Sequence, residues 1–349
     1  MKTRHSNNRK NGSNSESHLI ASSAAAAFVL SFLLLLIADH FLSGTDISLA
    51  LKLVLAGAFA VLLAVIDKFD KNESSERFDI DEKGRVMIKG TCIGAVAGDV
   101  AGSKYEFNNI KTKDFPLFSD GCSFTDDTVM TCAVKTALAR YLSGGREGSL
   151  HEMMIEEMKY YGNEYPDAGY GGRFSNWLVS DSSEPYNSFG NGSAMRVSAC
   201  AFMASDIEEA REWAVISSEV THNHPDGING AEATAAAIFT ALSGGTKEDI
   251  KREMEKYYRI DFTVDEIRPS YAFSETCMGS VPQAFECFLE AEDYEDCIRN
   301  CISIGGDCDT TAAIAGAVAE AYFGVPEEIN EQALSFLPHD LRDIIQGKC

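Results

Sequence analysis

Two long apolar stretches near the start of the chain restrict its fold more than any other feature of the sequence. Residues 19–38 carry no charge, and residues 47–66 carry only Lys52. A helix rises about 1.5 Å per residue, so each stretch is long enough to cross the roughly 30 Å hydrocarbon core of a bilayer. The sequence therefore predicts a hairpin of two transmembrane helices.

The charges around these stretches predict the orientation of the hairpin. Asp39 and Asp46 lie in the turn, whereas both outer flanks are basic, with Lys2, Arg4, Arg9 and Lys10 before the hairpin and Lys68 and Lys71 after it. Basic flanks stay on the cytoplasmic side of a membrane. We therefore expect a multi-pass membrane protein with a basic cytoplasmic tail (1–18), two spans (19–66), a linker (67–84) and a cytoplasmic domain (85–349).

Two other interpretations of the apolar segment stand beside the hairpin. A cleaved signal peptide also has a basic start, but its apolar core usually has only about 7 to 15 residues. Helices buried in a protein core are usually shorter than these stretches. The length of both stretches favours the hairpin over either alternative.

The net charge of the chain belongs almost entirely to its second part. Residues 71–349 contain 24 basic and 48 acidic side chains, whereas residues 1–70 contain six and five. An acidic surface repels phosphate backbones, so we expect no nucleic-acid-binding surface. The size and composition of this part are those of a large globular domain.

Apolar side chains in this second part recur mostly at helical spacing. The pattern predicts helices over 128–142, 151–161, 206–220, 232–242, 247–258, 281–290, 294–304 and 310–323. Only 85–89 shows a weak strand pattern, and several prolines lie beside predicted helix boundaries, namely Pro225, Pro282, Pro326 and Pro338. We therefore expect an all-α fold, a single compact multi-helix domain preceded by the two-helix hairpin.

The ten cysteines do not predict a disulfide framework. Their spacing follows no paired pattern, and many lie in apolar helical patterns where a thiol acts as a small hydrophobic group. Cys297 and Cys301 are four residues apart on one predicted helix, but no CxxC pair is present to complete a metal site. We expect free thiols in this large cytoplasmic domain.

Two acidic clusters stand where a loop leads into a predicted helix. The first is Thr125-Asp126-Asp127, and the second is Asp307-Cys308-Asp309-Thr310. Capping of free N–H groups and the helix dipole explain a single aspartate at such a place. Capping does not require two carboxylates and a hydroxyl at both places, and such oxygen ligands suit Mg²⁺, Mn²⁺ or Ca²⁺. Metal binding is favoured, and capping stays open as the alternative.

Three further segments have both a structural and a functional interpretation. In 98–106 the small residues suit a tight helix end, while Glu106 could act as a general acid or base. The glycine-rich turn 188–196 could hold a diphosphate on backbone N–H groups, although Asn-Gly mostly marks turns. The spacing of His222 and His224 suggests a metal site, but an oxygen-ligand site does not need imidazole. None of the three decides a function by itself.

In this order, the five clusters resemble those of the ADP-ribosylglycohydrolase family. The resemblance covers residues 89–337; each motif is weak alone, but five in family order are specific. It implies an all-α fold and cleavage of the bond between C1″ of ADP-ribose and its acceptor. The implied cofactors are two Mg²⁺ or Mn²⁺ ions, and the implied substrate is an ADP-ribosylated protein or small molecule.

The resemblance also implies roles for individual residues. The implied metal ligands are Thr125, Asp126, Asp127, Asp307, Asp309 and Thr310. The implied catalytic residues are Glu106 and Asp307, and the implied substrate-binding residues are Ser188, Phe189, Gly190, Asn191, Gly192 and His222. His224 is expected to lie further from the substrate. The family usually has a small residue where Cys308 stands, so Cys308 adds an oxidisable group near the metals.

The implied chemistry is hydrolysis through an oxocarbenium-like state, with metal ions fixing the ribose hydroxyls and positioning water. Arginine is the favoured acceptor, while serine, a nucleic-acid end and O-acetyl-ADP-ribose stay open. One alternative is an inactive sensor or structural protein that binds ADP-ribose or a related nucleotide. Another is an all-α prenyl-transfer enzyme, but this expects an Asp-Asp-x-x-Asp run, and Asp127 is followed by Thr128, Val129 and Met130.

Overall fold

The structure is a computed structural model that describes residues 78–80 and 86–348, all within the compact unit Arg77–Cys349. The predicted hairpin at 19–66, the basic tail and most of the linker lie outside these residues. Among the described helices, none combines the length and the apolar character needed to cross a membrane.

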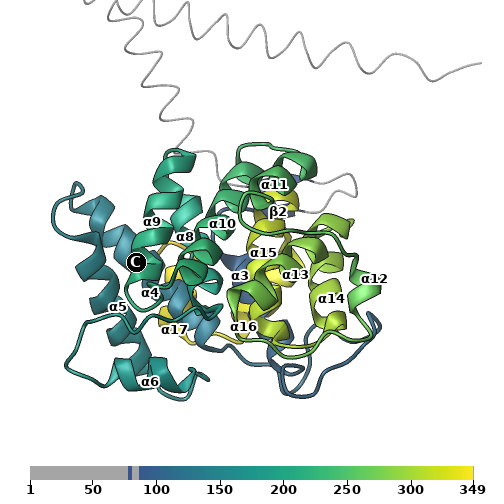
Figure 1. Ribbon diagram of the computed structural model, residues 1–349, viewed down its shortest axis with the longest axis horizontal. Coiled ribbons are helices and arrows are strands. Elements are labelled where there is room, and N and C mark those ends of the chain that lie inside the picture. The colour runs from purple at the N-terminus through teal and green to yellow at the C-terminus, as the bar shows by residue number, and fades with distance from the viewer. Residues whose placement is uncertain (1–77, 81–85, 349) are drawn as a thin grey trace, which may run out of the picture. The chain divides into compact units, whose positions relative to one another are not determined.

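The regular secondary structure of the described chain is almost entirely helical (Figure 1). They are α3 (Ile93–Ser103), α4 (Asp126–Ser143), α5 (Leu150–Glu164), α6 (Gly172–Leu178), α7 (Gly192–Met195), α8 (Ser198–Met203), α9 (Ile207–Glu219), α10 (Pro225–Leu242), α11 (Lys247–Met254), α12 (Val264–Ile267), α13 (Cys277–Glu290), α14 (Tyr294–Ile304), α15 (Cys308–Phe323), α16 (Glu327–Ser335) and α17 (His339–Ile345). The all-α prediction is confirmed for this domain.

One small antiparallel sheet accompanies the helices. Its strand order is β1 (Phe78–Ile80), β2 (Val86–Ile88) and β3 (Val325–Pro326), and Ile88 pairs with both Phe78 and Val325. Strand β2 falls within the weak strand pattern at 85–89, whereas β1 lies in the segment expected as a linker. Strands of two or three residues are too short to show alternation, so the sequence could not predict β1 or β3.

The eight helices predicted from periodicity are confirmed, with α14 at the predicted bounds. Pro225 begins α10, and Pro326 and Pro338 stand at the N-caps of α16 and α17. The placement of Pro282 beside a helix boundary is wrong, because α13 begins five residues earlier and contains it. The N-cap of α13 is Thr276, whose side chain accepts a hydrogen bond from the Gly279 N–H. The first turn contains polar and glycine residues, so the apolar spacing that predicts a helix is absent there.

Helix α3 was not predicted, because it is buried on nearly every side and therefore shows no amphipathic pattern. It packs directly against α15 in the middle of the domain (Figure 1). A Cβ atom on Gly94 would lie 2.3 Å from the Gly316 carbonyl oxygen, and one on Gly98 would lie 2.2 Å from that of Ala312. Glycine thus lets the two backbones touch, which brings the end of α3 beside the start of α15.

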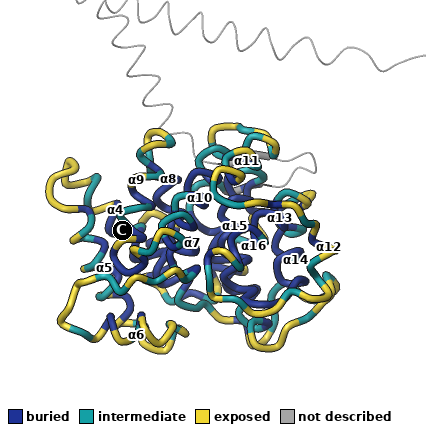
Figure 2. Tube along the Cα trace, in the orientation of Figure 1, coloured by how far each residue is buried: buried dark blue, intermediate teal, exposed yellow. Residues whose placement is uncertain are grey.

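Burial is concentrated in the helices around α15, and the exposed residues lie mainly on the peripheral loops and helix ends (Figure 2). The nine cysteines of the described residues are buried, and no disulfide joins them. The candidate metal-ligand groups found among the described residues contain only aspartate and glutamate, so neither Cys297 nor Cys301 belongs to one.

Candidate active site

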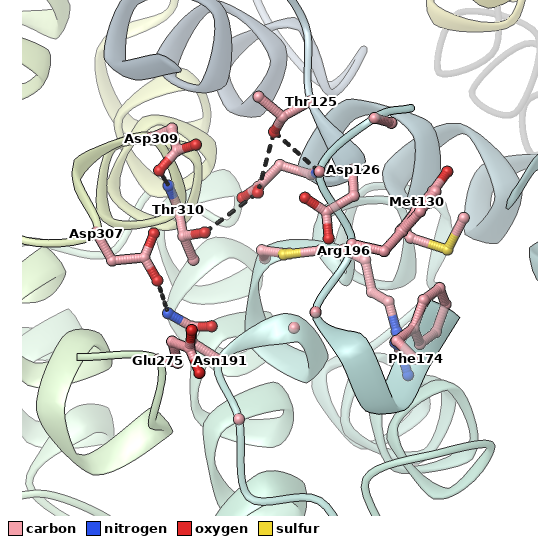
Figure 3. A pocket seen from close by; sticks show the side chains of 18 of the residues that line it. Thr125, Asp126, Met130, Phe174, Asn191, Arg196, Glu275, Asp307, Asp309 and Thr310 are labelled. Carbon is pink, nitrogen blue, oxygen red and sulfur yellow. Dashed lines mark hydrogen bonds between the residues drawn. The ribbon is translucent and has the colours of Figure 1, made fainter. Parts of the chain in front are cut away.

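A cavity of about 460 Å³ gathers residues from several segments that are far apart in the sequence (Figure 3). Its wall is formed by the starts of α4 and α15, the loop after α3, and residues from 168–174, 186–192 and 273–275. The predicted site residues line it, with the exception of Phe189. The folded chain therefore brings the five sequence clusters to one place.

The carboxylates at the two helix starts are not explained by capping. At α4 the N-cap is Thr125, whose side chain accepts a hydrogen bond from the Asp127 N–H. At α15 the N-cap residue is Asp307, and its carboxylate makes no capping bond. Asp126, Asp127 and Asp309 lie in the first turns, where the helix dipole favours them. Capping alone therefore leaves the Asp307 carboxylate without a structural reason.

The two acidic segments contact each other directly. The Thr310 Oγ1 donates a hydrogen bond to Asp127 Oδ2 at 3.1 Å, which joins α15 to α4 (Figure 3). Carboxylate oxygens of Glu106, Asp307 and Asp309 lie within 4.8 Å of one another. Hard oxygen donors from both helices thus surround one region of the cavity.

One oxygen in this region has no partner within the protein. Asp127 Oδ1 is buried and makes no hydrogen bond. A buried carboxylate oxygen without a donor is costly, because it has lost its hydration. Carboxylates and threonine hydroxyls are the ligand types that Mg²⁺ and Mn²⁺ prefer. This donor set therefore fits divalent cations.

The electrostatics of the cluster are unbalanced. Burial raises the pKa of Asp126 to about 8, with a further contribution from the negative charges of Asp99 and Asp307. Burial and then the Asp307 charge raise the pKa of Glu106 to about 7. In the part of the chain that the structure describes, no lysine or arginine forms an ion pair with these carboxylates. A bound cation is what would remove this repulsion.

Asp99 is a buried residue of the site that sequence reasoning did not select. Its Oδ2 accepts hydrogen bonds from the N–H groups of Thr125 at 2.9 Å and Thr128 at 3.1 Å, and both threonine hydroxyls also donate to its carboxylate. Asp99 also has an oxygen within 4.8 Å of those of Asp127 and Asp309. Since four donors already hold Asp99, we regard it as the residue that positions the start of α4. An aspartate inside a run of small and apolar residues was the available signal.

The glycine-rich loop lies against the second acidic segment. The Asn191 side-chain amide donates to Asp307 Oδ2 at 2.7 Å and to Ser280 Oγ at 3.1 Å, so Asn191 orients Asp307. A Cβ atom on Gly192 would lie 3.3 Å from His222 Nε2, so glycine allows the loop to approach this imidazole. The Asn191 N–H also donates to the Glu275 carbonyl at 2.8 Å, which ties the loop to the chain before α13.

The cavity wall also carries positive charge, from Arg173 and Arg196. Arg196 is only 1% exposed and donates to the Ser217 carbonyl and the Thr221 hydroxyl, and among the described residues no carboxylate forms an ion pair with it. Burial lowers the pKa of Arg196 to about 10, so it is still charged. Burial, Arg196 and Arg173 lower the pKa of His222 well below its usual value, so His222 is neutral. A buried cation without a counter-ion suits an anionic ligand.

Sequence reasoning missed Arg196 and Arg173 as lining residues. Arg196 ends the glycine-rich cluster that the sequence singled out, and Arg173 follows the three glycines at 169, 171 and 172. Both signals were local and weak, because a glycine-rich run mostly marks a turn.

Three residues of the sequence clusters lie elsewhere. Phe189 is 43% exposed and its ring centroid lies 5.4 Å from that of His224. His224 is the N-cap of α10 and its Nδ1 accepts a hydrogen bond from the Asp226 N–H, so its role is structural. Cys308 is buried with its Sγ 3.5 Å from the Gly102 carbonyl, and burial raises the pKa of its thiol well above the usual value.

The chain is similar to known proteins over most of the described domain. Residues 81–346 match the family model described as ADP-ribosylglycohydrolase. The chain is 28% identical over 318 residues to ADP-ribosylhydrolase ARH3 of Gallus gallus, which covers 68% of this chain and 85% of that protein. It is 26% identical over 286 residues to ADP-ribosylarginine hydrolase Tri1 of Pseudomonas putida, covering 73% and 76%.

A solved structure described as an ADP-ribosylglycohydrolase-related protein complex has a similar fold. The TM-score is 0.54 at 20% sequence identity, and the match covers 73% of this chain and 94% of that chain. At this identity the likeness concerns the fold alone.

Proposed function

The chain belongs to the ADP-ribosylglycohydrolase family, and from this membership we propose that it is a metal-dependent hydrolase that releases ADP-ribose by cleaving its C1″ glycosidic bond. The observation that carries the proposal is the distribution of charge in the cavity. Carboxylates from three separate segments line the cavity, and the buried Arg196 and the glycine-rich loop line the same cavity. A sugar joined to a diphosphate needs both environments.

The donor set fits two divalent cations, which Thr125, Asp126, Asp127, Asp307, Asp309 and Thr310 would hold. Bound Mg²⁺ or Mn²⁺ would supply Lewis-acid stabilisation of the ribose hydroxyls and of the attacking water. The chain holds these ligands in advance, since Asp99 binds Thr125 and Asn191 binds Asp307.

We propose that Glu106 exchanges a proton with water or with the leaving group. It lines the cavity, and its carboxylate lies within 4.8 Å of those of Asp307 and Asp309 without belonging to the proposed ligand set. General acid–base catalysis requires a carboxyl group within hydrogen-bond reach of the reacting atoms. We assign Glu106 this role on its position.

We assign the diphosphate to the region of the cavity beside the glycine-rich loop. Ser188, Gly190, Asn191 and Gly192 line it, together with Arg196 and the neutral His222. A guanidinium can donate two parallel hydrogen bonds to phosphate oxygens. Phe189 does not line the cavity. We propose that it contacts the substrate only if the substrate extends beyond the glycine-rich loop.

We propose arginine as the acceptor. Two observations support it: the similar protein from Pseudomonas putida is described as an ADP-ribosylarginine hydrolase, and acidic side chains dominate the metal-binding side of the cavity. An arginine acceptor is basic and complements such a surface.

We also propose that residues 19–66 anchor the protein in a membrane with the hydrolase domain on the cytoplasmic side. The support is the length of the two apolar stretches and their basic flanks. The full-length chain should sediment with membranes and be released by detergent but not by high salt. A chain that stays in solution after membranes are pelleted would contradict the anchor.

The hydrolase proposal is tested by incubating the purified full-length chain with Mg²⁺ and a panel of ADP-ribosylated acceptors. We expect free ADP-ribose from at least one acceptor, and none with excess EDTA. Mg²⁺ at about 100 times its dissociation constant should also raise the free energy of unfolding by about 2.7 kcal/mol. Binding of ADP-ribose without turnover of any acceptor would instead identify a sensor or structural protein.

A further inference from the structure

Two exposed phenylalanines stand at the edge of the cavity, and the proposed chemistry does not use them. Phe107 is 79% exposed and Phe273 is 44% exposed, and both line the cavity. Their rings are stacked, with centroids 6.1 Å apart and an interplanar angle of 26°. Aromatic side chains that converge on the edge of a polar cavity indicate contact with part of a ligand.

The two rings come from separate loops that are both tied to the chain just before α15. The Asn109 side-chain amide donates to the carbonyls of Glu106 at 2.8 Å and Gly306 at 3.0 Å, and its oxygen accepts the Gly306 N–H at 2.7 Å. The Lys111 ammonium donates to the carbonyls of Tyr271, at 2.8 Å, and Ile304. Each loop is therefore fixed relative to the acidic cluster, and the ring pair is held in place beside it.

Close contact with Gly306 fixes the second loop further. Gly306 has a φ of +76°, and a Cβ atom there would lie 2.5 Å from the Tyr271 ring. Only glycine permits both this backbone conformation and this approach. The loop that carries Phe273 thus rests directly on the segment that carries Asp307.

Carboxylates accompany both rings. Glu106 immediately precedes Phe107, and Glu275 follows Phe273 by two residues, and both carboxylates line the cavity. Glu275 adjoins the glycine-rich loop, since its carbonyl accepts a hydrogen bond from the Asn191 N–H at 2.8 Å, and the Asn191 side chain in turn donates to Asp307 Oδ2. The edge of the cavity therefore combines exposed aromatic surface with negative potential.

We propose that Phe107 and Phe273 form the acceptor subsite and select a planar cationic leaving group, the guanidinium of an ADP-ribosylated arginine. This inference rests on the proposed hydrolase function and deepens it by naming specificity-determining residues. A guanidinium is weakly hydrated and stacks on aromatic rings, and Glu106 and Glu275 supply the complementary charge. A serine acceptor offers neither a planar face nor a positive charge, so the ring pair does not favour it.

The reaction at this subsite is a balanced hydrolysis. The oxygen of water forms a bond to C1″ while the bond from C1″ to the guanidine nitrogen breaks. One proton of the water stays on the new C1″ hydroxyl, and the other reaches the leaving guanidine. The ring pair contacts only the acceptor, so it should affect turnover of arginine-linked substrate without affecting the binding of free ADP-ribose.

The test compares wild type with Phe107→Leu and with the double variant Phe107→Leu/Phe273→Leu in the full-length chain. Leucine keeps apolar bulk but removes the ring face. With Mg²⁺, kcat/KM for ADP-ribosyl-arginine should fall about 3- to 30-fold, while kcat/KM for an ADP-ribosyl-serine peptide and the dissociation constant for ADP-ribose should change less than about twofold. Tyr160→Leu is the matched control, since Tyr160 on α5 is 57% exposed and does not line the cavity.

The outcomes separate this inference from the hydrolase function. Wild-type turnover of arginine-linked substrate with no change in either variant would overturn the acceptor subsite and leave the hydrolase standing. An equal loss for all acceptors and for ADP-ribose binding would show that the rings act structurally, and activity of the wild type on serine-linked substrate alone would exclude arginine selection. Failure of the wild type to release ADP-ribose from any acceptor would instead overturn the proposed function, and the subsite with it.

Discussion

Two groups of acidic side chains in this domain have opposite surroundings. On α9, Arg211 forms ion pairs with Glu232 of α10 at 3.2 Å and Glu253 of α11 at 2.5 Å, and the Tyr257 hydroxyl donates to Glu232. In the cavity, the carboxylates of α4 and α15 face one another, and among the described residues no arginine or lysine pairs with them. One group joins three helices, and the other places like charges together at a cost in stability.

The surroundings of the carboxylates distinguish a structural acidic cluster from a functional one. A carboxylate that has its cation within the fold stabilises tertiary structure. Where carboxylates are buried together without a cation, burial and then the neighbouring charges raise their pKa, and an oxygen can lack a donor, as in Asp127. The comparison predicts that substitutions in the two groups change different quantities.

The largest expected effect is on turnover. Asp307→Ala removes a proposed metal ligand and should lower ADP-ribose release by more than about 100-fold. Loss of a residue that only hydrogen-bonds to a metal ligand usually costs about 10- to 100-fold. The free energy of unfolding in EDTA should be unchanged or higher, because one repelling charge is gone. Turnover should be followed with saturating Mg²⁺ and unfolding with urea. Retained turnover would remove the metal mechanism.

Asp99→Ala should lower stability more than substitution of any aspartate that lines the cavity. It leaves the N–H groups of Thr125 and Thr128 without their acceptor, and unsatisfied buried donors cost about 1–3 kcal/mol each. We expect the free energy of unfolding to fall by about 3 kcal/mol in urea denaturation with EDTA present. Asp99→Asn retains one acceptor oxygen and should lose less. If Asp99→Ala were as stable as wild type, Asp99 would belong with the ligands and not with the positioning residues.

Arg211→Leu should lower stability without changing the chemistry. The substitution leaves Glu232 and Glu253 without their shared cation. Because the Arg211 side chain is 14% exposed, the free energy of unfolding should fall by about 2 kcal/mol, less than for a fully buried ion pair. ADP-ribose release per folded molecule should stay within about twofold of wild type. Urea denaturation and an activity assay on the same sample measure both quantities, and a selective loss of turnover would mean that this cluster reaches the cavity.

The smallest expected effect is a pH dependence of stability at Glu286, which belongs to neither acidic group. On α13, burial and then the neighbouring Glu290 raise the pKa of Glu286 to about 7, while Lys251 of α11 acts in the opposite direction. A raised carboxyl pKa gives stability that is present below the unfolded pKa and lost as the pH rises through about 7.

Glu286→Gln imitates the protonated form and should therefore stabilise the domain by about 1 kcal/mol at pH 8, with a smaller gain at pH 5. Melting temperatures of wild type and variant at the two pH values measure this difference. Glu290→Gln is the matched comparison on the same helix. An equal gain at both pH values would show that packing, and not titration, causes the effect.

Much of the domain could be predicted from neighbouring residues. Helix α14 shows a complete amphipathic period and has the predicted bounds, whereas α3 is apolar on all sides and was missed. The acidic clusters were found because each occupies a helix start. Asp99 was missed because a lone aspartate in a run of small residues has no local signature, and Phe273 and Glu275 were missed because their loop has no pattern of its own.

The helical class of the domain, the acidic helix starts and the family resemblance could be read from the linear sequence, because periodicity and motif order exist before the chain folds. The tertiary structure alone decided which oxygen atoms meet and which residue holds them. That decision depends on the backbone contact of α3 with α15, which places Asp99, Asp127 and Asp309 within 4.8 Å of one another although Asp309 lies far along the chain. Local sequence carries no record of that distance, because the packing of distant helices creates it.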